Sequence, residues 1–213
     1  MKRSSDRIIT SHAGSLPRPD DLLDANAKRE QGKADEGAFQ KKLTQSVADV
    51  VARQVKAGIA VPGDGEYGKS MGSATNYRSW WSYSFTRLSN LKIEDIDRDT
   101  MPVHRSSPGN TVLSTFADRR DRIRFKRAYS DPESGITTGP KPLNWPFAVG
   151  PVKYSGQEAI AHDIANFKAA LKASGVGEGF MTSIGPASCA RIGNRHYRTD
   201  DEFVFACAEA MRE

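Results

Sequence analysis

The chain has 213 residues, and its 31 Lys and Arg against 26 Asp and Glu give a formal net charge of +5. Hydrophobic residues make up 38% and charged residues 27%, a balance that excludes an intrinsically disordered chain of low hydrophobicity and high charge. No apolar run approaches the roughly 18 residues of a membrane-spanning helix, and the N-terminus lacks the apolar core of a signal peptide. We therefore expect no membrane partner and a cytoplasmic location.

The first part of the chain has the rhythm of a β/α repeat. Residues 7–10 are predicted as a short buried strand, and prolines exclude a continuous helix from the turn-rich loop 11–19. Over 38–57, apolar residues recur at steps of three and four positions and predict an amphipathic helix. Residues 59–61 form the next predicted strand, and the glycine-rich loop 62–68 follows it.

Residues 69–150 interrupt this rhythm, because they are rich in serine and proline and show no long helical period. We interpret the stretch as a long insertion that contains a hairpin. Within it, charged residues alternate with Ile123 and Phe125 and predict a half-exposed strand over 122–127. The aromatic cluster 80–83 offers rings on which a planar ligand can stack, although packing against the rest of the fold is the favoured interpretation.

The rhythm resumes after the insertion. An apolar segment over 147–154 precedes a predicted helix over 156–173. A strand over 178–184 and a loop over 185–188 follow, and the last predicted element is a helix over 200–213.

The last helix has a start signal but no stop signal. Thr199 or Asp200 can cap its first turn, and Glu202 is placed for a capping box if Thr199 is the cap. The sequence stops inside this helix without a terminating glycine, so we expect it to be a fragment.

Two loops carry the candidate chemistry, residues 12–15 after the first strand and 64–66 after the second. In β/α architectures the loops at the carboxyl ends of the strands build the active site. Gly14 lets the backbone approach a ligand closely, Ser15 offers a hydroxyl, and Glu66 offers a carboxylate for an ammonium group or for general-base work. Turn chemistry alone is the alternative explanation of these residues.

The cysteines predict no site of their own. Cys189 and Cys207 are too few for a disulfide framework, and their spacing fits no zinc motif. We expect two buried, reduced thiols, no metal site made by residues of this chain, and no catalytic residue among those singled out.

Several stretches, in the expected order, are similar to one enzyme family. Residues 10–19 (TSHAGSLPRP) resemble the opening of the catalytic barrel in cobalamin-independent methionine synthase and its shorter single-barrel relatives. Residues 64–69 (DGEYGK) resemble the family's second-strand signature, and 179–188 (GFMTSIGPAS) its third-strand segment. Residues 194–197 (NRHY) and 203–212 resemble the helix after it.

The resemblance implies an α/β fold, an incomplete (β/α)8 TIM barrel. It would comprise roughly the first three βα units with a long insertion after the second strand, in one partial barrel domain over 1–213 with the insertion at about 69–150. A TIM barrel usually needs about 250 residues, so part of one should leave an open strand edge. We therefore expect self-association or dependence on a missing C-terminal half.

The resemblance also implies an activity, the transfer of a methyl group from a methylated folate to the thiol of homocysteine in methionine biosynthesis. A zinc ion activates the thiol in that family, with ligands that would lie outside this chain. By the match, Ser15 and the backbone at Gly14 would hold the amino acid's carboxylate, and Glu66 its ammonium group. The chain alone is then expected to be inactive.

Two other functions stay open. A truncated, non-catalytic protein that binds an amino acid or a partner would also lack the metal ligands. The basic run over 119–127 allows a nucleic-acid binder, although acidic residues are interleaved with it and a solvated face is the favoured interpretation.

Overall fold

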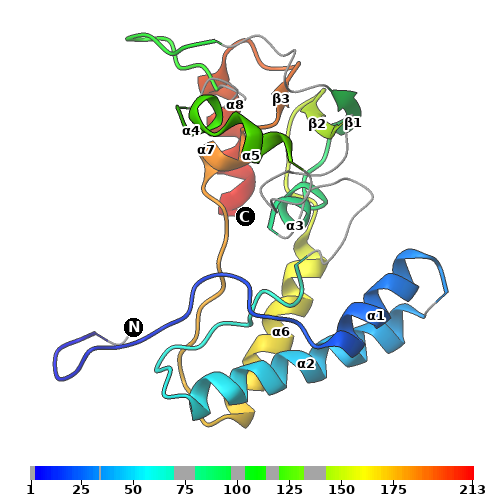
Figure 1. Ribbon diagram of the computed structural model, residues 1–213, viewed down its shortest axis with the longest axis vertical. Helices are drawn as coiled ribbons and strands as arrows, with labels where there is room; N and C mark the ends of the chain where they lie inside the picture. Colours follow the sequence, from blue (N-terminus) through cyan, green and yellow to red (C-terminus); the bar gives the residue numbers. More distant parts are fainter. Residues whose placement is uncertain (1–2, 34, 70–79, 97–103, 114–119, 132–142) are drawn as a thin grey trace. The chain divides into compact units, whose positions relative to one another are not determined.

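The computed structural model describes residues 3–33, 35–69, 80–96, 104–113, 120–131 and 143–213. The chain forms two compact units (Figure 1). The first takes Met1–Ser73, Arg78–Tyr83 and Gly156–Ser183, and the second takes Ala74–Tyr77, Ser84–Ser155 and Ile184–Glu213. The insertion expected over about 69–150 falls mainly in the second unit, and the single domain over 1–213 stays a prediction.

The described elements, in chain order, are α1 (Asp20–Glu30), α2 (Glu36–Lys56), α3 (Trp80–Phe85), β1 (Leu91–Ile96), α4 (Arg120–Arg124), α5 (Lys126–Ser130), β2 (Leu143–Ala148), α6 (Gln157–Ala173), α7 (Pro186–Cys189), β3 (Gly193–Asn194) and α8 (Asp200–Arg212). Among the residues described, no helix has both the length and the apolar composition needed to cross a bilayer.

Helix α2 organises the first unit and confirms the helix predicted over 38–57. The Asp35 carboxylate accepts the Ala38 N–H at 3.1 Å, which caps the helix start. Just past the C-terminus, Gly58 has φ +86°, a conformation that costs glycine little.

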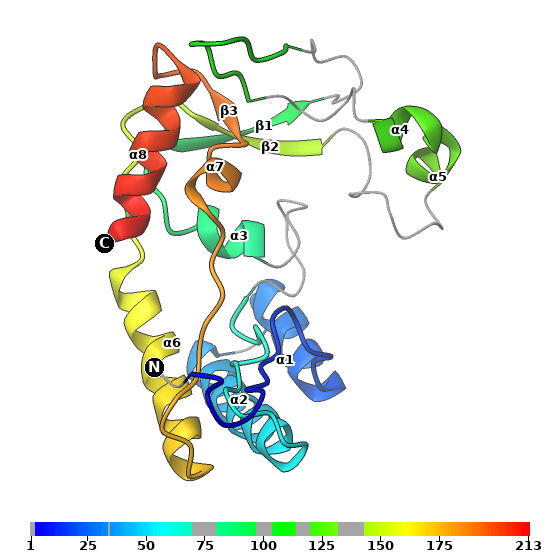
Figure 2. The same ribbon diagram turned by 90° about the vertical axis from the view of Figure 1, so that its left-hand side faces the viewer.

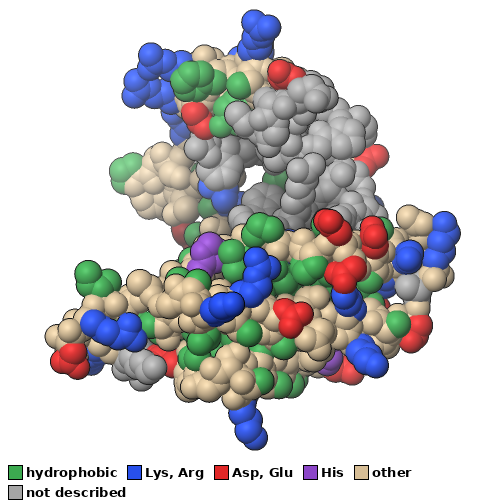
Figure 3. Space-filling model, turned by 60° about the horizontal axis from the view of Figure 1, so that its bottom comes forward, with side chains coloured by type: hydrophobic (Ala, Val, Ile, Leu, Met, Phe, Trp, Pro, Cys, Tyr) green, Lys and Arg blue, Asp and Glu red, His purple; other side chains and the backbone are tan. Residues whose placement is uncertain are grey.

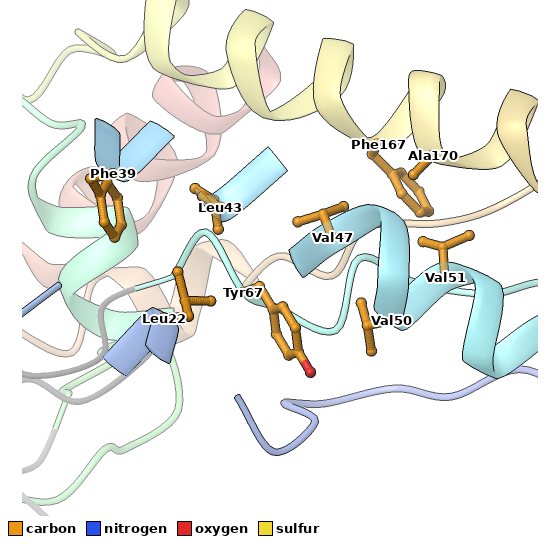
Figure 4. Close-up of a cluster of buried hydrophobic side chains, with 9 residues drawn as sticks. All are labelled: Leu22, Phe39, Leu43, Val47, Val50, Val51, Tyr67, Phe167 and Ala170. Atoms are coloured by element: carbon orange, nitrogen blue, oxygen red, sulfur yellow. The ribbon is translucent and has the colours of Figure 1, made fainter. Parts of the chain in front are cut away.

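The core of the first unit lies between helices. Helix α6 confirms the helix predicted over 156–173, and Figure 4 shows Phe167 and Ala170 pointing from α6 toward Val47 and Val51 of α2. The buried cluster comprises Leu22, Phe39, Leu43, Val47, Val50, Val51, Tyr67, Phe167 and Ala170. Helix α1, which the sequence analysis did not predict, contributes Leu22 to this cluster.

Three extended segments of the first unit lie next to one another in chain order. Ser11 and Val61 form a parallel bridge, and the Val61 N–H donates to the Thr10 carbonyl at 3.0 Å. The Phe180 N–H donates to the Pro62 carbonyl at 3.2 Å. Helix α2 separates the first two segments, and α6 precedes the third. This succession agrees with the predicted β/α rhythm, but the strands predicted over 7–10, 59–61 and 178–184 are not regular strands. Residues 7–10 are also mostly exposed rather than buried, with Ile8 at 83%. The described residues form no closed barrel.

The second unit contains a mixed sheet with strands in the order β1-β2-β3 (Figure 2). Strands β1 and β2 pair antiparallel within the predicted insertion, while β2 pairs parallel with β3. Phe147 lies opposite Gly193, where an added Cβ would stand 1.9 Å from the Phe147 ring. The Arg195 guanidinium lies 3.9 Å from the centre of the same ring. Gly193 is therefore required where the aromatic ring covers the neighbouring strand.

The strand predicted over 122–127 is wrong, because the structure has the short helices α4 and α5 there. The Phe125 N–H donates to the Asp121 carbonyl at 2.8 Å, a helical step of four residues. Ile123 and Phe125 are 68% and 58% exposed, so their alternation with charged residues does not reflect a buried face. The aromatic cluster 80–83 falls in α3, and the side chains of its two tryptophans lie outside the described residues.

Helix α8 confirms the helix predicted over 200–213. The Thr199 hydroxyl accepts the Glu202 N–H at 3.1 Å, which identifies Thr199 as the cap. The Glu202 carboxylate accepts the N–H of Arg198, one residue before the position that a capping box uses. The loop predicted over 185–188 is largely the short helix α7.

On the face shown in Figure 3, acidic and basic side chains are interspersed with hydrophobic ones.

Candidate functional site

Two side chains singled out in the sequence meet in the first unit. The Ser15 hydroxyl donates to Glu66 Oε2 at 2.5 Å, across 51 positions of sequence. The Leu16 N–H donates to the Gly65 carbonyl at 3.1 Å and joins the two loops through the backbone. Gly14 adjoins Ser15 with φ +102° and has open space where a Cβ would stand. The roles of Gly14, Ser15 and Glu66 as substrate ligands stay a prediction.

The loop that carries Glu66 has an unusual backbone. Gly65 and Glu66 are consecutive residues with φ +67° and +59°. A left-handed conformation costs a non-glycine residue about 1–2 kcal/mol. The Asp64 carboxylate accepts the Glu66 N–H at 2.9 Å and so stabilises the turn. A strained backbone conformation persists only where the surrounding structure stabilises it, and such residues cluster at functional sites. Here the left-handed conformation sets the position of the Glu66 side chain.

Two further residues of the cluster were missed by the sequence analysis, Lys69 and Thr182. Glu66 Oε1 accepts the Lys69 ammonium at 2.8 Å and also the Thr182 hydroxyl. Lys69 lies in the same 64–69 stretch as Glu66, and Thr182 lies in the 179–188 stretch. In the sequence, the one sign of a role for these two residues is that each lies in a stretch that resembles the family. No spacing rule predicts which residues of two irregular loops come into contact.

The Arg18 side chain bonds to the backbone of the loop that carries Glu66. Its Nη2 donates to the carbonyl of Glu66 at 2.6 Å and to that of Lys69 at 3.3 Å. The Tyr67 hydroxyl donates to the Pro17 carbonyl at 2.6 Å, so the first loop holds the second at two further points. Together these bonds make the carboxylate part of a rigid cluster.

The electrostatics fix Glu66 as an anion. Burial raises the pKa of the Glu66 carboxyl, but hydrogen bonds from Lys69, Ser15 and Thr182 outweigh it and leave the pKa below its ordinary value. Burial raises the pKa of the neighbouring Asp64 carboxyl and lowers the pKa of Arg18. An ionised, hydrogen-bonded carboxylate is suited to holding a cation, and this arrangement disfavours the general-base role considered from sequence.

The lowered pKa of Glu66 predicts how stability changes with pH. Because its pKa is lower in the folded than in the unfolded chain, ionised Glu66 contributes stability above its unfolded pKa of about 4.3, and this contribution is lost as pH falls through the folded pKa. We expect the difference in unfolding free energy between wild type and Glu66→Gln to be constant from neutral pH to about pH 5 and to shrink below it.

Urea unfolding of both proteins over this pH range measures the difference. The Glu66 charge contributes to the raised pKa of Asp64, so the comparison is made in an Asp64→Asn background, which removes that titration. A difference that stays constant at acidic pH would contradict the assignment of Glu66 as an ionised, hydrogen-bonded group.

The described residues do not fit the zinc ion that the resemblance implies. Among them, no three His, Cys, Asp or Glu residues are grouped so that they could hold a metal ion. Cys189 and Cys207 belong to the second unit, on the neighbouring helices α7 and α8. A hydrogen bond between their thiols lowers the pKa of Cys189 and raises that of Cys207. The two thiols thus interact with each other in the protein interior.

The burial of the two thiols predicts their reactivity. Cys189 is 1% and Cys207 0% exposed, so a thiol reagent such as Ellman's reagent should react with neither cysteine in the native chain. Both should react in denaturant. Absorbance at the reagent's product band measures the number of accessible thiols, and rapid labelling of the native chain would show that α7 and α8 open.

No protein-family profile matches the sequence, and no curated protein matches it. One similar solved structure is a B12-independent methionine synthase from Shewanella sp. W3-18-1 in complex with selenomethionine. This chain resembles part of that enzyme in fold. The TM-score is 0.55 at 15% sequence identity, over 95% of this chain and 45% of the synthase chain.

This likeness to the methionine synthase concerns the fold, because identity is low. It agrees with the family resemblance found from the sequence motifs. The chain spans less than half the length of that methionine synthase, so the activity of the whole enzyme comes to this chain only as a proposal.

Proposed function

We propose that this chain supplies amino-acid recognition to an S-methyltransferase of the methionine-synthase type, which transfers a methyl group from a donor such as methylated folate to homocysteine. The observation that carries the proposal is the contact between Ser15 and Glu66, which follow adjacent parallel segments at their carboxyl ends. The fold of the methionine synthase from Shewanella supports it. In this proposal the chain is the first three βα units of an incomplete (β/α)8 barrel.

The ligand's two charged groups would be held by different parts of the cluster. Ser15 and the backbone at Gly14 would hold the carboxylate, for which the single proton of the Ser15 hydroxyl would turn from Glu66 to the ligand, and Glu66 would hold the ammonium group. A carboxylate has about four lone-pair positions. The described contacts use two on Glu66 Oε1 and one on Oε2, so Oε2 has a further position that no described residue fills. Ser15 is exposed, and in this proposal the ligand reaches Oε2 past the Ser15 side chain.

Zinc, where the reaction uses it, would activate the thiol as a nucleophile, with ligands outside this chain. The part of the chain's own residues is to bind and orient the amino-acid end of the substrate. A second function, a non-catalytic protein that binds an amino acid, is favoured by the lack of a metal-binding group among the described residues. Turnover in the presence of a complementary C-terminal half distinguishes the two functions.

Titration calorimetry with L-homocysteine under reducing conditions tests the binding proposal. Glu66→Gln and Ser15→Ala should each weaken binding by about tenfold or more, as expected when a hydrogen bond to a charged group is lost. Glu158→Gln, an exposed residue in the first turn of α6, is the matched control and should bind as wild type does. Equal affinity of wild type and Glu66→Gln would reject the proposal.

A further inference from the structure

Lys69 is a buried lysine whose ammonium group contacts the candidate ligand-binding carboxylate. Lys69 is 4% and Glu66 6% exposed. Lys69 Nζ lies 2.8 Å from Glu66 Oε1, 3.1 Å from the Thr182 carbonyl and 2.7 Å from the Thr182 hydroxyl. Because an ammonium group has three N–H donors, these contacts satisfy it completely. The protein therefore provides its own cation for Glu66.

This internal cation changes what the site can bind. At Oε1 the charge of Glu66 is already paired with Lys69, and a second cation, Arg18, donates to the Glu66 carbonyl at 2.6 Å. The carboxylate of Asp64 accepts the Glu66 N–H, and that of Asp163 accepts a tyrosine hydroxyl at 2.7 Å. A ligand ammonium arriving at Oε2 thus meets a carboxylate that is already paired, with two protein cations and two further carboxylates nearby.

We infer that Lys69 is a specificity-determining residue, which makes the Ser15–Glu66 site accept zwitterionic amino acids and reject simple amines. The inference rests on the proposed function, because it concerns the same carboxylate and the same ligand. A zwitterion brings its own carboxylate, which Lys69 and Arg18 attract, whereas an amine brings only positive charge, which they repel. Discrimination then comes from unfavourable interactions with the wrong ligand as much as from favourable ones with the right ligand.

The test compares L-methionine with its decarboxylated analogue, a methylthio-propylamine that keeps the thioether and the ammonium group. Titrations at about pH 8 keep both the amine and Glu66 ionised. Wild type should bind L-methionine at least about tenfold more tightly than the amine, a difference of about 1.4 kcal/mol.

Lys69→Gln removes the charge and keeps a donor for Glu66. In this variant the affinity for the amine should rise by about tenfold or more, and the affinity for L-methionine should fall. Lys69→Arg is the matched control, because it keeps the charge and should keep the wild-type preference. The double variant Glu66→Gln/Lys69→Gln should lose the gain in amine binding, since the gain depends on the Glu66 carboxylate.

An unchanged amine affinity in Lys69→Gln overturns the inference, and so does an equal gain in the double variant. Amine binding by wild type that is as tight as methionine binding also overturns the inference, whether or not Lys69→Gln folds. The proposed function fails separately if wild type does not bind methionine while Lys69→Gln gains Glu66-dependent amine binding. If wild type binds methionine through Glu66 but Lys69→Gln gains no amine binding, the proposed function stands and the inference about Lys69 fails.

Discussion

Phe167→Ala is expected to destabilise the first unit by about 3–5 kcal/mol, the usual cost of removing a buried phenylalanine. Phe167 is 5% exposed and lies in the core between α6 and α2. Its ring also contacts the third extended segment, because a Cβ added at Gly179 would stand 2.6 Å from Phe167 Cζ. Urea unfolding followed by circular dichroism measures the loss, and a change below about 1 kcal/mol would show that the core collapses around the cavity.

Gly179→Ala provides the partner for a double-mutant cycle. Its added Cβ would crowd the Phe167 ring, Leu171 and, at 2.9 Å, the Pro62 carbonyl oxygen, so the single substitution should cost about 1–3 kcal/mol. With Phe167 reduced to alanine, one of these contacts is relieved. The double variant should therefore lose less than the sum of the single losses, by about 0.5–3 kcal/mol. Strict additivity would show that the segment carrying Thr182 is not positioned by α6.

The long helices could be predicted from the sequence because their apolar residues repeat over many turns. Helix α2 buries Phe39, Leu43, Val47 and Val51 on one face, and that regular spacing is visible without a structure. Helix α1 was missed, since the prolines before it drew attention to a loop and its single deeply buried apolar side chain, Leu22, sets no period.

The strands were harder to predict, because a strand depends on its partners. The stretch 122–127 alternates charged and apolar residues, yet its apolar side chains face solvent from helix α4 and from the turn between α4 and α5. By contrast, the apolar segment predicted over 147–154 overlaps β2 only at its last two residues, and the partners β1 and β3 lie far from β2 in sequence. Pairing over such separations is decided by packing, for which a local pattern gives no evidence.

Two of the four residues of the candidate site could be predicted from the sequence. Ser15 and Glu66 could be singled out because each follows a predicted strand, and strand ends meet at one edge of a β/α fold. Lys69 and Thr182 could not be assigned, because their contacts with Glu66 depend on the left-handed turn at Gly65 and Glu66 and on the third segment lying beside the second. The sequence thus indicated the anion and missed the cation that pairs with it.

Lys69→Met is expected to cost about 3–5 kcal/mol of unfolding free energy, because it leaves the Glu66 carboxylate buried without its cation. In this variant the Ser15 and Thr182 hydroxyls still donate to Glu66. Because these two hydrogen bonds remain, the loss of unfolding free energy should lie toward the lower end of that range. Urea unfolding at neutral pH measures the effect. Lys42→Met is the control, because the ion pair of Lys42 with Asp21 is partly exposed and exposed pairs contribute only about 0–1 kcal/mol.

The double variant Glu66→Gln/Lys69→Met separates the cost of an unpaired charge from the value of the ion pair. Removing both charges of a buried pair is often neutral or stabilising, whereas removing one is strongly destabilising. The double variant should therefore recover most of the stability lost in Lys69→Met, while losing the ligand binding that depends on Glu66. A double variant as unstable as Lys69→Met would show that the Lys69 contacts with Thr182, rather than its charge on Glu66, hold the loop in place. In that case, Lys69 would serve the fold through Thr182 and not through its ion pair, and ligand selectivity would have to come from other charges around Ser15.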